Sequence, residues 1–569
     1  MAHRRYDQEP RYAPIGGAVG SGWDAAVATL PAAPAVLAVD GPAALDWPAV
    51  AAGIAKAMAR RGVPVDTVDV RELMVPWQQV LERTASAELS EDDPDFATLA
   101  GGTLEDLFDA LPRPVPAADG VVVAFGPGAA LLAPDVLWYA DLPKRYAEAA
   151  VSAGTGANLG RPAAAGAGTL KRLFYIDWPL LDRHRDAIAP RVDCWIDTQD
   201  PDEPAWLSGA ALRSTLAALA RRPFRTRPTF NSTPWGGRWA QRVLGVNPDA
   251  RNTALGYELI APESGILIGE QNGPRVEAPF QLAVALFPQE ILGEQVHSVF
   301  GTSFPIRFDY LDTVDGGNLS VHCHPQPDYM NRVFGWPYTQ HETYYMMVGG
   351  EDRKVFLGLR DGVDVEAFHH DAHEADGHGR AFEITRYVQT FPAEPHQLFL
   401  IPAGTPHGSG EGNVVLEISA TPYLYSLRFY DWLRRDAEGR QRPVHVEHAF
   451  RNLATERSGE AVERDLVQRP RIVRRGEGWH EELLGELPEM FFDVARLVLE
   501  AGSAGSGDTA GRFHVLNVVE GDGVMVETGD GHAHPLAYAE TLVIPASVGS
   551  YVLRPMGSER VRIVKARVR

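Results

Sequence analysis

The pattern of the chain changes near residue 225, and this change constrains the fold more than any other feature. Before it, short β-branched runs alternate with Ala-rich stretches, as in AVLAVDG (35–41) followed by WPAVAAGIAKAMARRG (47–62). Such alternation predicts an α/β layer with a largely parallel sheet. After it, strand-like runs such as GILIGEQNG, NLSVHCHP and HQLFLIPAG are separated by Gly, Pro and Asn turns. That spacing is typical of a β-barrel or sandwich.

These patterns divide the 569 residues into five predicted segments. They are a mobile tail over residues 1–30, an α/β domain over 31–224, a first β-barrel over 225–455, a linker over 456–469 and a second β-barrel over 470–569. At about 100–200 residues per domain, a chain of this length is expected to be multidomain.

A polar insert, VDVEAFHHDAHEADG (363–377), interrupts the strand pattern of the first barrel with a helix-like composition. Its neighbourhood holds four histidines without strand alternation, namely His369, His370, His373 and His378. We expect these histidines to lie on a solvated loop rather than in a second metal site.

The two predicted barrels echo each other in sequence. VGGEDRKVFLG (348–358) resembles VEGDGVMVETG (519–529), and LFLIPAGTPHGSG (398–410) resembles TLVIPASVGSYVL (541–553). Two such matches in the same order predict a duplicated barrel.

Composition excludes several classes of protein. The chain has 53 Lys and Arg against 75 Asp and Glu, a formal net charge of −22, which disfavours nucleic acid or an anionic membrane as a partner. Only Cys194 and Cys323 are present, too few for a disulfide framework or a thiolate zinc site. The first ten residues lead into no apolar signal sequence, and the apolar stretch 121–140 is broken by Gly and Pro. We predict a cytoplasmic globular protein that could form homo-oligomers.

Four residues of the first barrel form a candidate metal site. In LSVHCHP (319–325), a strand places Ser320, His322 and His324 on one face and Cys323 in the core. Glu342 starts a later strand, and His407 follows a Pro/Gly-rich corner. Three imidazoles and one carboxylate suit Zn²⁺, Fe²⁺ or Mn²⁺.

The second barrel does not repeat this set of residues. Aligning the two barrels places Ser550 at the position of His407, and Phe513, with His514 beside it, at the position of Glu342. The second barrel is therefore predicted to lack the ligands and to be structural.

A set of motifs then suggests a family. The motifs are PWGG (234–237), LSVHCHP (319–325), ETYY (342–345), LIPAGTPH (400–407), VLEIS (415–419) and LRFYDW (427–432). In order and register they resemble class I (cupin-type) mannose-6-phosphate isomerases, over about 225–455 and 470–569. The resemblance implies two cupin-type barrels, of which the first holds one zinc ion.

The resemblance also implies roles for particular residues. Its zinc ligands fall on His322, His324, Glu342 and His407. Arg428, in the LRFYDW motif, corresponds to an arginine that takes part in catalysis, and Ser320 to a residue at the phosphate or substrate.

The chain departs from the family pattern at two positions. His322 stands where the family has Gln, which makes the ligand set similar to the three-His, one-Glu site of cupin oxygenases. Gln340 stands where the family has a substrate-facing Lys, so a fixed cation is lost. In sequence, Arg332 and Lys354 are the nearest candidates to replace that charge.

The function implied is metal-dependent isomerisation of an aldose to a ketose, mannose-6-phosphate to fructose-6-phosphate by resemblance. The reaction moves a proton between C1 and C2 through an enediolate, whose charge a metal and Arg428 can stabilise. His341 and Glu417 are candidates for moving the proton. Two alternatives stay open: a non-catalytic sugar-binding regulator, and a metal-dependent oxygenase.

The N-terminal domain has a fainter resemblance of its own. VLAVDGPAALDWP (36–48) starts like the P-loop strand of uridine-kinase-like enzymes. A P-loop needs G-x-x-x-x-G-K-[ST], and here Asp46, Trp47 and Pro48 occupy its last three positions. We therefore expect a kinase-like fold, or another α/β fold with a Gly-Pro turn, that transfers no phosphate.

Overall fold

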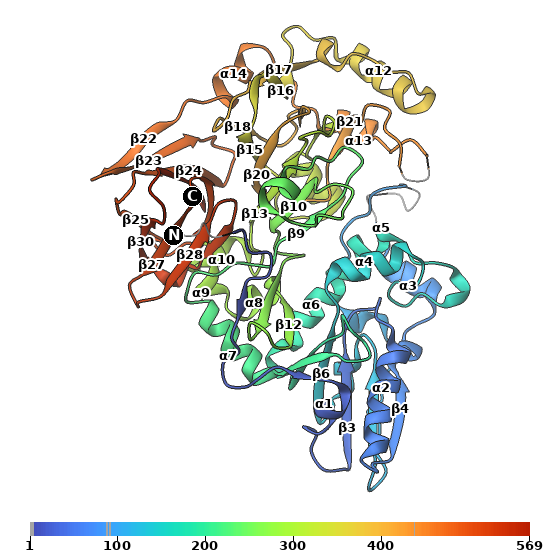
Figure 1. Ribbon diagram of the computed structural model, residues 1–569. Helices are drawn as coiled ribbons and strands as arrows, with labels where there is room; N and C mark the ends of the chain where they lie inside the picture. Colours follow the sequence, from blue (N-terminus) through green and yellow to red (C-terminus); the bar gives the residue numbers. More distant parts are fainter. Residues whose placement is uncertain (1–4, 87–88, 90–92, 437–438) are drawn as a thin grey trace.

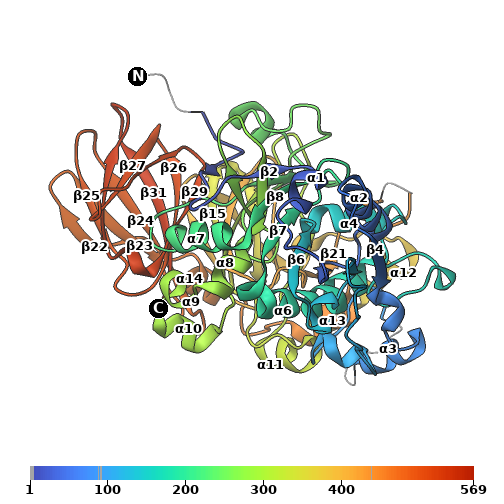
Figure 2. The same ribbon diagram turned by 90° about the horizontal axis from the view of Figure 1, so that it is seen from below.

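The computed structural model describes residues 5–86, 89, 93–436 and 439–569 (Figure 1). It contains several β-sheets with helices packed around them. The blue N-terminal sheet and the red C-terminal β-unit lie on opposite sides of the molecule in both views (Figures 1 and 2). None of the described helices combines the length and apolar character needed to cross a membrane.

The N-terminal part contains the predicted α/β sheet. Its seven strands are ordered β2 (Gly20–Ser21), β8 (Ala205–Ser208), β7 (Cys194–Asp197), β6 (Val136–Asp141), β3 (Ala35–Asp40), β5 (Val121–Phe125) and β4 (Val65–Asp69). The five strands from β7 to β4 are parallel, which confirms the sequence prediction. Every residue of β3 and β5 is buried because helices cover both faces of the sheet.

Three helices cover the two faces. α2 (Trp47–Arg60) packs on one face through Trp47 and Ile54, and its first turn is capped by the carboxylate of Asp46. On the other face lie α6 (Trp178–Ile188) and α7 (Gly209–Leu219). α4 (Lys144–Ser152) follows β6, and its Arg145 pairs with Glu277 further along the chain.

Residues 5–30 do not form the mobile tail that the sequence predicted. β1 (Arg11–Tyr12) pairs in parallel with β11 (Gly265–Gly269), which pairs with β12 (Arg275–Pro279). β2 pairs with β8, and α1 (Trp23–Val27) packs on α2. The difference arises because this segment satisfies its backbone hydrogen bonds on distant parts of the chain. We call residues 5–30 the N-terminal strap.

The first β-unit consists of two sheets. One is ordered β18 (Leu398–Ile401), β15 (Glu342–Val348), β20 (Val414–Ala420), β13 (Ile306–Asp312), β10 (Leu255–Leu259) and β9 (Thr229–Asn231). The other is ordered β17 (Val388–Ala393), β16 (Gly350–Leu359), β19 (His407–Ser409), β14 (Val321–Cys323) and β21 (Leu427–Tyr430).

The second β-unit repeats this arrangement. Its larger sheet is ordered β29 (Thr541–Ile544), β26 (His514–Glu520), β31 (Val561–Val568), β24 (Phe492–Leu499), β23 (Trp479–Gly485) and β22 (Arg471–Gly476). Its smaller sheet is ordered β28 (Ala533–Ala537), β27 (Gly523–Thr528), β30 (Ser550–Pro555) and β25 (Gly505–Asp508). Each of these strands occupies the place of one strand of the first unit, as a duplication requires.

The register corrects the sequence alignment of the two units by one residue. Glu342 pairs with Ile401, and in the second unit His514 pairs with Ile544 of the matching IPA motif. His514, rather than Phe513, therefore stands at the position of Glu342. The sequence alignment was wrong here because it matched the Val of each Val-x-Gly turn, whereas Val348 and Glu520 hold equivalent places in the pairing.

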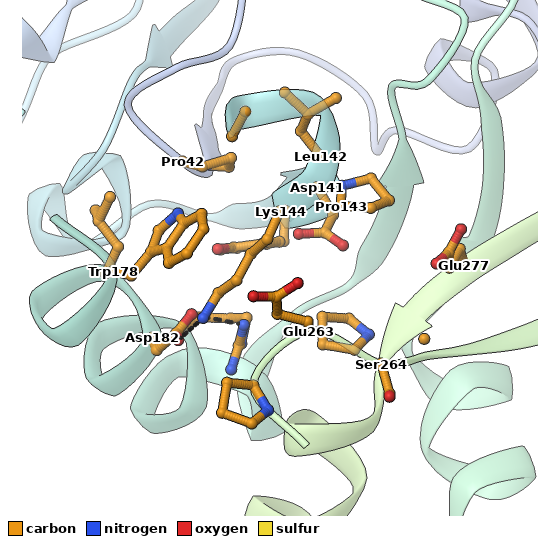
Figure 3. Close-up of a pocket in the computed structure, with 17 residues that line it drawn as sticks. Pro42, Asp141, Leu142, Pro143, Lys144, Trp178, Asp182, Glu263, Ser264 and Glu277 are labelled. Carbon is orange, nitrogen blue, oxygen red and sulfur yellow. Dashed lines mark hydrogen bonds and ion pairs between the residues drawn. The ribbon is translucent and has the colours of Figure 1, made fainter. Parts of the chain in front are cut away.

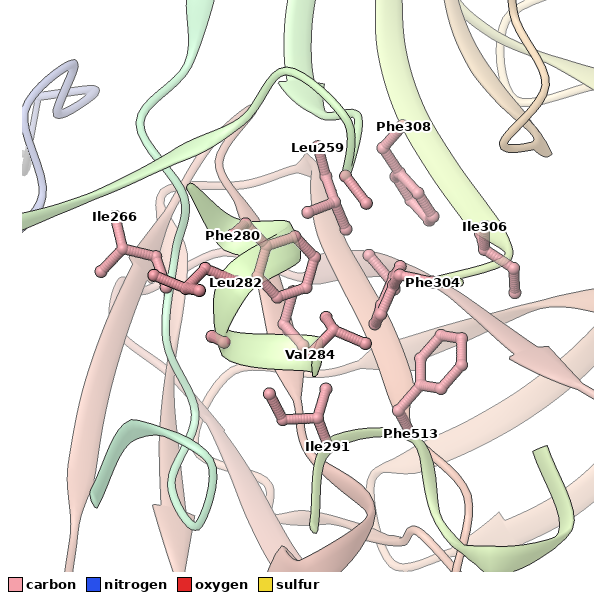
Figure 4. Close-up of a cluster of buried hydrophobic side chains, with 14 of the residues drawn as sticks. Leu259, Ile266, Phe280, Leu282, Val284, Ile291, Phe304, Ile306, Phe308 and Phe513 are labelled. Atoms are coloured by element: carbon pink, nitrogen blue, oxygen red, sulfur yellow. The ribbon is translucent and has the colours of Figure 1, made fainter. Parts of the chain in front are cut away.

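A buried apolar cluster joins the two β-units (Figure 4). Phe280 of α8 (Phe280–Leu286) lies 5.0 Å from Phe304, and Phe304 lies 4.2 Å from Phe513, measured between ring centroids. α9 (Pro288–Leu292) and α10 (Glu294–Phe300) complete this layer, and Figure 2 shows α8 between the two ends of the molecule. Burial of each such ring stabilises the contact by roughly 1.5–3 kcal/mol.

Two further segments differ from the sequence expectations. The predicted linker contains α14 (Glu460–Leu466), whose Val462 and Leu466 are fully buried against the first unit. The predicted solvated loop is the helix α12 (Val365–His378), capped at its start by Asp364. In both segments spaced apolar residues anchor one face of a helix, although most of the composition is polar.

Candidate metal centre

The four predicted ligands come together inside the first β-unit. His322 on β14 is the cross-strand neighbour of His407 on β19, and His324 follows two residues later on the same face. Glu342 reaches the group from β15 of the other sheet. One potential ligand atom from each residue lies within 4.8 Å of the others, and all four residues are buried. The geometry therefore gathers three nitrogens and one oxygen around one point.

Backbone carbonyls orient the three imidazoles. The Nδ1 atoms of His322, His407 and His324 lie 3.0, 2.9 and 3.2 Å from the carbonyl oxygens of Ser320, Thr405 and Tyr425. With the proton assigned to Nδ1, each ring donates to its carbonyl and leaves the Nε2 lone pair free. This is the arrangement that metal-binding histidines usually show.

The electrostatics of the cluster also fit a cation. Burial lowers the pKa of His322 and of His324, which favours the neutral, ligating form. Burial raises the pKa of Glu342, but His407 and His324 outweigh it, and the pKa is held well below its ordinary value. Oε2 of Glu342 contacts Nε2 of His324 and lies 3.1 Å from Nε2 of His407. A buried carboxylate among three imidazoles is a donor set suited to a divalent metal.

Three other predicted residues lie beside the cluster. Ser320 Oγ is 3.3 Å from Nδ1 of His322. Gln340, with its amide in the orientation that satisfies its neighbours, donates to Pro422 O at 2.6 Å, and its amide nitrogen lies 3.2 Å from Nδ1 of His324. His341 accepts a hydrogen bond from the Ala403 amide at 3.2 Å, and burial lowers its pKa to about 4.

Arg428 has a less direct relation to the cluster. It pairs with His322 in the strand register, but its Nη1 donates to Pro443 O at 2.8 Å. Burial and the nearby Arg442 lower its pKa to about 10. Within the described residues, no hydrogen bond or ion pair joins Arg428 to the four ligands.

The two cations suggested by the sequence are not at the site. Arg332 lies in a π-helical turn, residues 330–334, and Lys354 lies on β16; both are exposed. Proximity in sequence was misleading because both residues lie on the exposed surface, whereas the four clustered residues are buried.

Arg307, a buried cation next to the cluster, was not predicted from the sequence. Arg307 on β13 pairs with Ser419 on β20, and Ser419 pairs with Glu342, so all three lie in one row across the sheet. Its Nε donates to Ser419 Oγ at 2.6 Å, and its Nη2 contacts Glu417. Its Nη2 also lies 2.9 Å from the Gln340 amide oxygen in the satisfied orientation. Strand alternation in IRFDYLD (306–312) was the available signal.

The next row supplies further groups that can exchange protons. Asp309, Glu417 and Tyr344 are aligned across β13, β20 and β15. Burial raises the pKa of Glu417 well above its ordinary value and that of Asp309 to about 6. Oδ1 of Asp309 and the hydroxyl of Tyr344 are buried without a hydrogen-bond partner in the structure. Polar groups of this kind beside a metal-type cluster are typical of a reaction site.

An open cleft adjoins these rows and is lined in part by the helix α4 of the N-terminal part. Glu148 and Ser152 of α4 face Tyr257 of β10 and Tyr423 across it. Tyr257 pairs with Asp309, and the Arg307 guanidinium lies 5.9 Å from the centre of the Tyr423 ring. The cleft therefore lies one side chain away from the row that contains Glu342.

A second pocket lies at the carboxyl ends of β3 and β6 (Figure 3). Lys144 points into it and pairs with Asp182 at 2.6 Å. Asp141 has a buried oxygen without a partner, and burial raises its pKa to about 8. Ligands of open α/β sheets bind at this end of the strands.

Asp40, the last residue of β3, is surrounded by backbone amides at the same end of the sheet. Asp40 accepts hydrogen bonds from the amides of Gly41, Gly128 and Ala130 at 2.8, 3.2 and 2.8 Å. His184 adds a contact at 2.9 Å. The three amides therefore already donate to a carboxylate of the protein itself.

Comparison with known proteins gives a family model for the N-terminal part of the chain and named relatives for a longer stretch. A family model described as a domain of unknown function, DUF8485, matches residues 22–221. That description gives no support to the kinase-like resemblance proposed from the sequence.

Several relatives are mannose-6-phosphate isomerases. ManA of Bacillus subtilis is 25% identical over 343 residues, 59% of this chain and 96% of the relative. The enzyme of Streptococcus mutans is 25% identical over 216 residues, covering 38% of this chain and 63% of its own length. Among solved structures, the B. subtilis mannose 6-phosphate isomerase gives a TM-score of 0.49 at 18% identity, covering 61% of this chain and all of that chain. A phosphomannose isomerase variant from Salmonella typhimurium gives a TM-score of 0.46 at 15% identity, over 61% and 100%.

Proposed function

We propose that the chain is a metal-dependent sugar isomerase that interconverts an aldose and a ketose, with mannose-6-phosphate and fructose-6-phosphate as the favoured pair. The observation that carries the proposal is the buried cluster of His322, His324, Glu342 and His407. The curated relatives, named mannose-6-phosphate isomerases and matched over almost their full length in the case of ManA, support the same reaction class.

The four clustered residues would hold one zinc ion, with Fe²⁺ or Mn²⁺ as alternatives that the donor set also accepts. A bound divalent metal supplies Lewis-acid polarisation of a substrate oxygen and stabilises developing negative charge. The backbone carbonyls behind the imidazoles keep the Nε2 atoms aimed at that ion.

Glu417 is the candidate that the geometry favours for moving the proton between C1 and C2. Its carboxyl faces the barrel interior in the row next to Glu342, and Arg307 and Ser419 fix its orientation. His341 is less suited because its ring is engaged with the Ala403 amide. A proton-transfer group must come within hydrogen-bond reach of the substrate carbon's proton, and the cleft beside Tyr257 offers that approach.

The charged end of the substrate needs a cation that Gln340 does not supply. Arg428 is accompanied by Arg434 and Arg442, which both pair with Asp431 at 2.7 and 2.8 Å. Arg434 also donates to Asn318 O at 2.6 Å, two residues before Ser320 in the sequence. The carboxylates of Asp431 and Asp95 act on Arg428 from nearby and keep it charged. We propose that Arg428 receives the phosphate or the developing charge, and that Ser320 adds a hydrogen bond.

The test uses the metal-loaded chain against phosphorylated and free aldoses and ketoses. We expect turnover of mannose-6-phosphate that disappears with the metal and returns when the metal is restored. Sugar binding without turnover by any member of the panel would instead favour a non-catalytic regulator.

A second arm of the test compares kcat/KM for mannose-6-phosphate in the wild type and in Gln340→Lys. A rise in the variant would support a missing cation. High wild-type activity that falls in the variant would show that the arginines already satisfy the phosphate.

A further inference from the structure

We propose that α12 and α13 (Val446–Asn452) form a second, surface metal site, with His369, His373 and Glu447 as its ligands. The two histidines are four residues apart on α12, so their rings project from the same face. Their ring centroids are 4.5 Å apart, and one ligand atom from each of the three residues lies within 4.8 Å of the others. This proposal does not depend on the proposed function of the barrel.

The distances match those of ligands around one ion. Oε1 of Glu447 lies 3.0 Å from Nε2 of His373 and 3.6 Å from Nε2 of His369. Ligands placed tetrahedrally at about 2.0–2.1 Å from Zn²⁺ are separated by about 3.3–3.4 Å. A single carboxylate oxygen therefore faces both imidazoles at the spacing that a bound ion requires, with adjustments of a few tenths of an ångström.

The helices that carry the ligands are held together by apolar packing nearby. Phe368, which is fully buried, lies 4.9 Å from Phe450 of α13 and 5.3 Å from Phe429 of β21. The ring of His369 rests edge-on against Phe450 at 4.6 Å. Because this packing fixes α12 against α13, the ligands are brought together before an ion binds.

The site is open to solvent on its outer side. The side chains of His369, His373 and Glu447 are 40%, 45% and 59% exposed, so an ion can enter and water can complete the coordination. Two imidazoles and one carboxylate favour Zn²⁺ and similar first-row ions over Mg²⁺ or Ca²⁺. Arg451 lies 3.9 Å from Oε2 of Glu447, whereas both histidines pair with Oε1.

An ion at this position would act on the barrel through α13. Sγ of Cys323, between His322 and His324 on β14, donates to Ala449 O of α13 at 3.7 Å. α13 is thus the layer behind the strand that carries two of the barrel ligands. An ion that joins α12 to α13 would stabilise this layer without touching the substrate.

The experiment measures zinc in the full chain by elemental analysis after equilibration with micromolar Zn²⁺, together with the Zn²⁺ dependence of Tm. The variant is His373→Ala, and the matched control is His370→Ala, an imidazole on the same helix outside the cluster. We expect the wild type and the control each to bind one zinc ion more per chain than His373→Ala, with affinity for the lost ion reduced at least tenfold. The Zn²⁺-dependent rise in Tm should be lost with it.

A second variant, His324→Ala, separates this site from the barrel site. It should lose one zinc ion and all turnover but keep the zinc that His373→Ala loses. The proposal is overturned if His373→Ala keeps the zinc content and Tm response of the wild type. Because the three ligands are exposed, the far-ultraviolet circular dichroism of metal-free His373→Ala should match that of the wild type, and a changed spectrum would contradict the assignment of a surface role.

Discussion

The two β-units share a strand order but differ in what faces their interiors. In the first unit, His322, Glu342 and His407 meet at one point. By register, the equivalent positions of the second unit are Asp508, His514 and Ser550. There Ser550 donates to Asp508 at 2.6 Å, and Nδ1 of His514 is 2.9 Å from the hydroxyl of Tyr551. The second unit therefore satisfies these side chains within the protein.

The neighbouring rows differ in the same way. The places of Glu417 and Ser419 are taken by Lys565 and Arg567. Lys565 pairs with Glu481 at 2.5 Å, and Arg567 pairs with Asp493 at 3.0 Å. The same strand arrangement therefore occurs with and without a cluster of potential metal ligands, so the barrel fold by itself does not determine the chemistry of its interior. Side chains whose partners are missing or shared, as around Asp309 and Tyr344, mark the unit that we propose to be active.

The largest expected effect is the loss of a ligand in the first unit only. His324→Ala should lower kcat by about 10³-fold or more and release the metal, because three ligands hold the ion poorly. His514→Ala, the counterpart change in the second unit, should leave metal content and kcat unchanged. Elemental analysis and steady-state kinetics check both variants. A full complement of metal in His324→Ala would remove the basis of the ligand assignment.

The next effect concerns the row behind the ligands. Glu417→Gln should reduce kcat by about 10²–10⁴-fold while the metal stays bound, since the amide cannot accept and return a proton. Kinetics and metal analysis on the same preparation give the answer. An unchanged kcat would exclude Glu417 as the proton-transfer group and leave His341 as the candidate for that role.

A third change tests whether the second unit is purely structural. Lys565→Met leaves the buried carboxylate of Glu481 without its closest partner and should cost about 3–5 kcal/mol of stability. Turnover per folded molecule should not change. The double variant with Glu481→Gln should recover part of the stability in urea unfolding. A loss of kcat comparable to that of Glu417→Gln would show that the two units are functionally coupled.

The smallest effect is a pH dependence confined to the first unit. Burial raises the pKa of Asp309 to about 6, whereas Ala495 occupies the equivalent position of the second unit. A raised pKa means that the folded state holds the proton more tightly, so this contribution to stability is complete below about pH 4 and is lost as pH rises through about 6. In metal-free protein, Asp309→Asn should therefore reduce the decline in the free energy of unfolding between pH 4 and 7 by about 1–3 kcal/mol. Urea titrations at several pH values measure this difference between the wild type and Asp309→Asn. If the free energy of unfolding declines equally with pH in both proteins, the prediction is wrong.

The sequence predicted the candidate site better than its surroundings. His322 and His324 were placed on one face by the period of a strand, and the structure brings Glu342 and His407 to them. Their role as metal ligands stays a prediction. Arg307 was not found because its place beside Glu342 depends on the pairing of β13 with β20, which short-range patterns do not contain.

The errors in fold prediction have the same origin. The segment with His369 was expected to be a loop because polar residues dominate it, yet Phe368 and Ala372 anchor a helix on the barrel. The N-terminal strap was taken for a tail because its partners, such as Leu267, lie more than 250 residues away. The isomerase hypothesis came from motifs, and the relatives support it at the level of a sugar isomerase.

The N-terminal strap has a consequence for the order in which the chain folds during synthesis. The amide of Asp7 donates to Glu540 at 2.8 Å, a pairing that spans 533 residues. The hydroxyl of Tyr6 contacts Glu258, which also accepts from the Thr541 amide at 2.9 Å. At about 5–20 residues per second, a ribosome needs roughly half a minute to two minutes to supply those distant partners. Residues 6 and 7 are thus synthesised long before residues 540 and 541, and this part of the strap can reach its native place only after the second β-unit has been made.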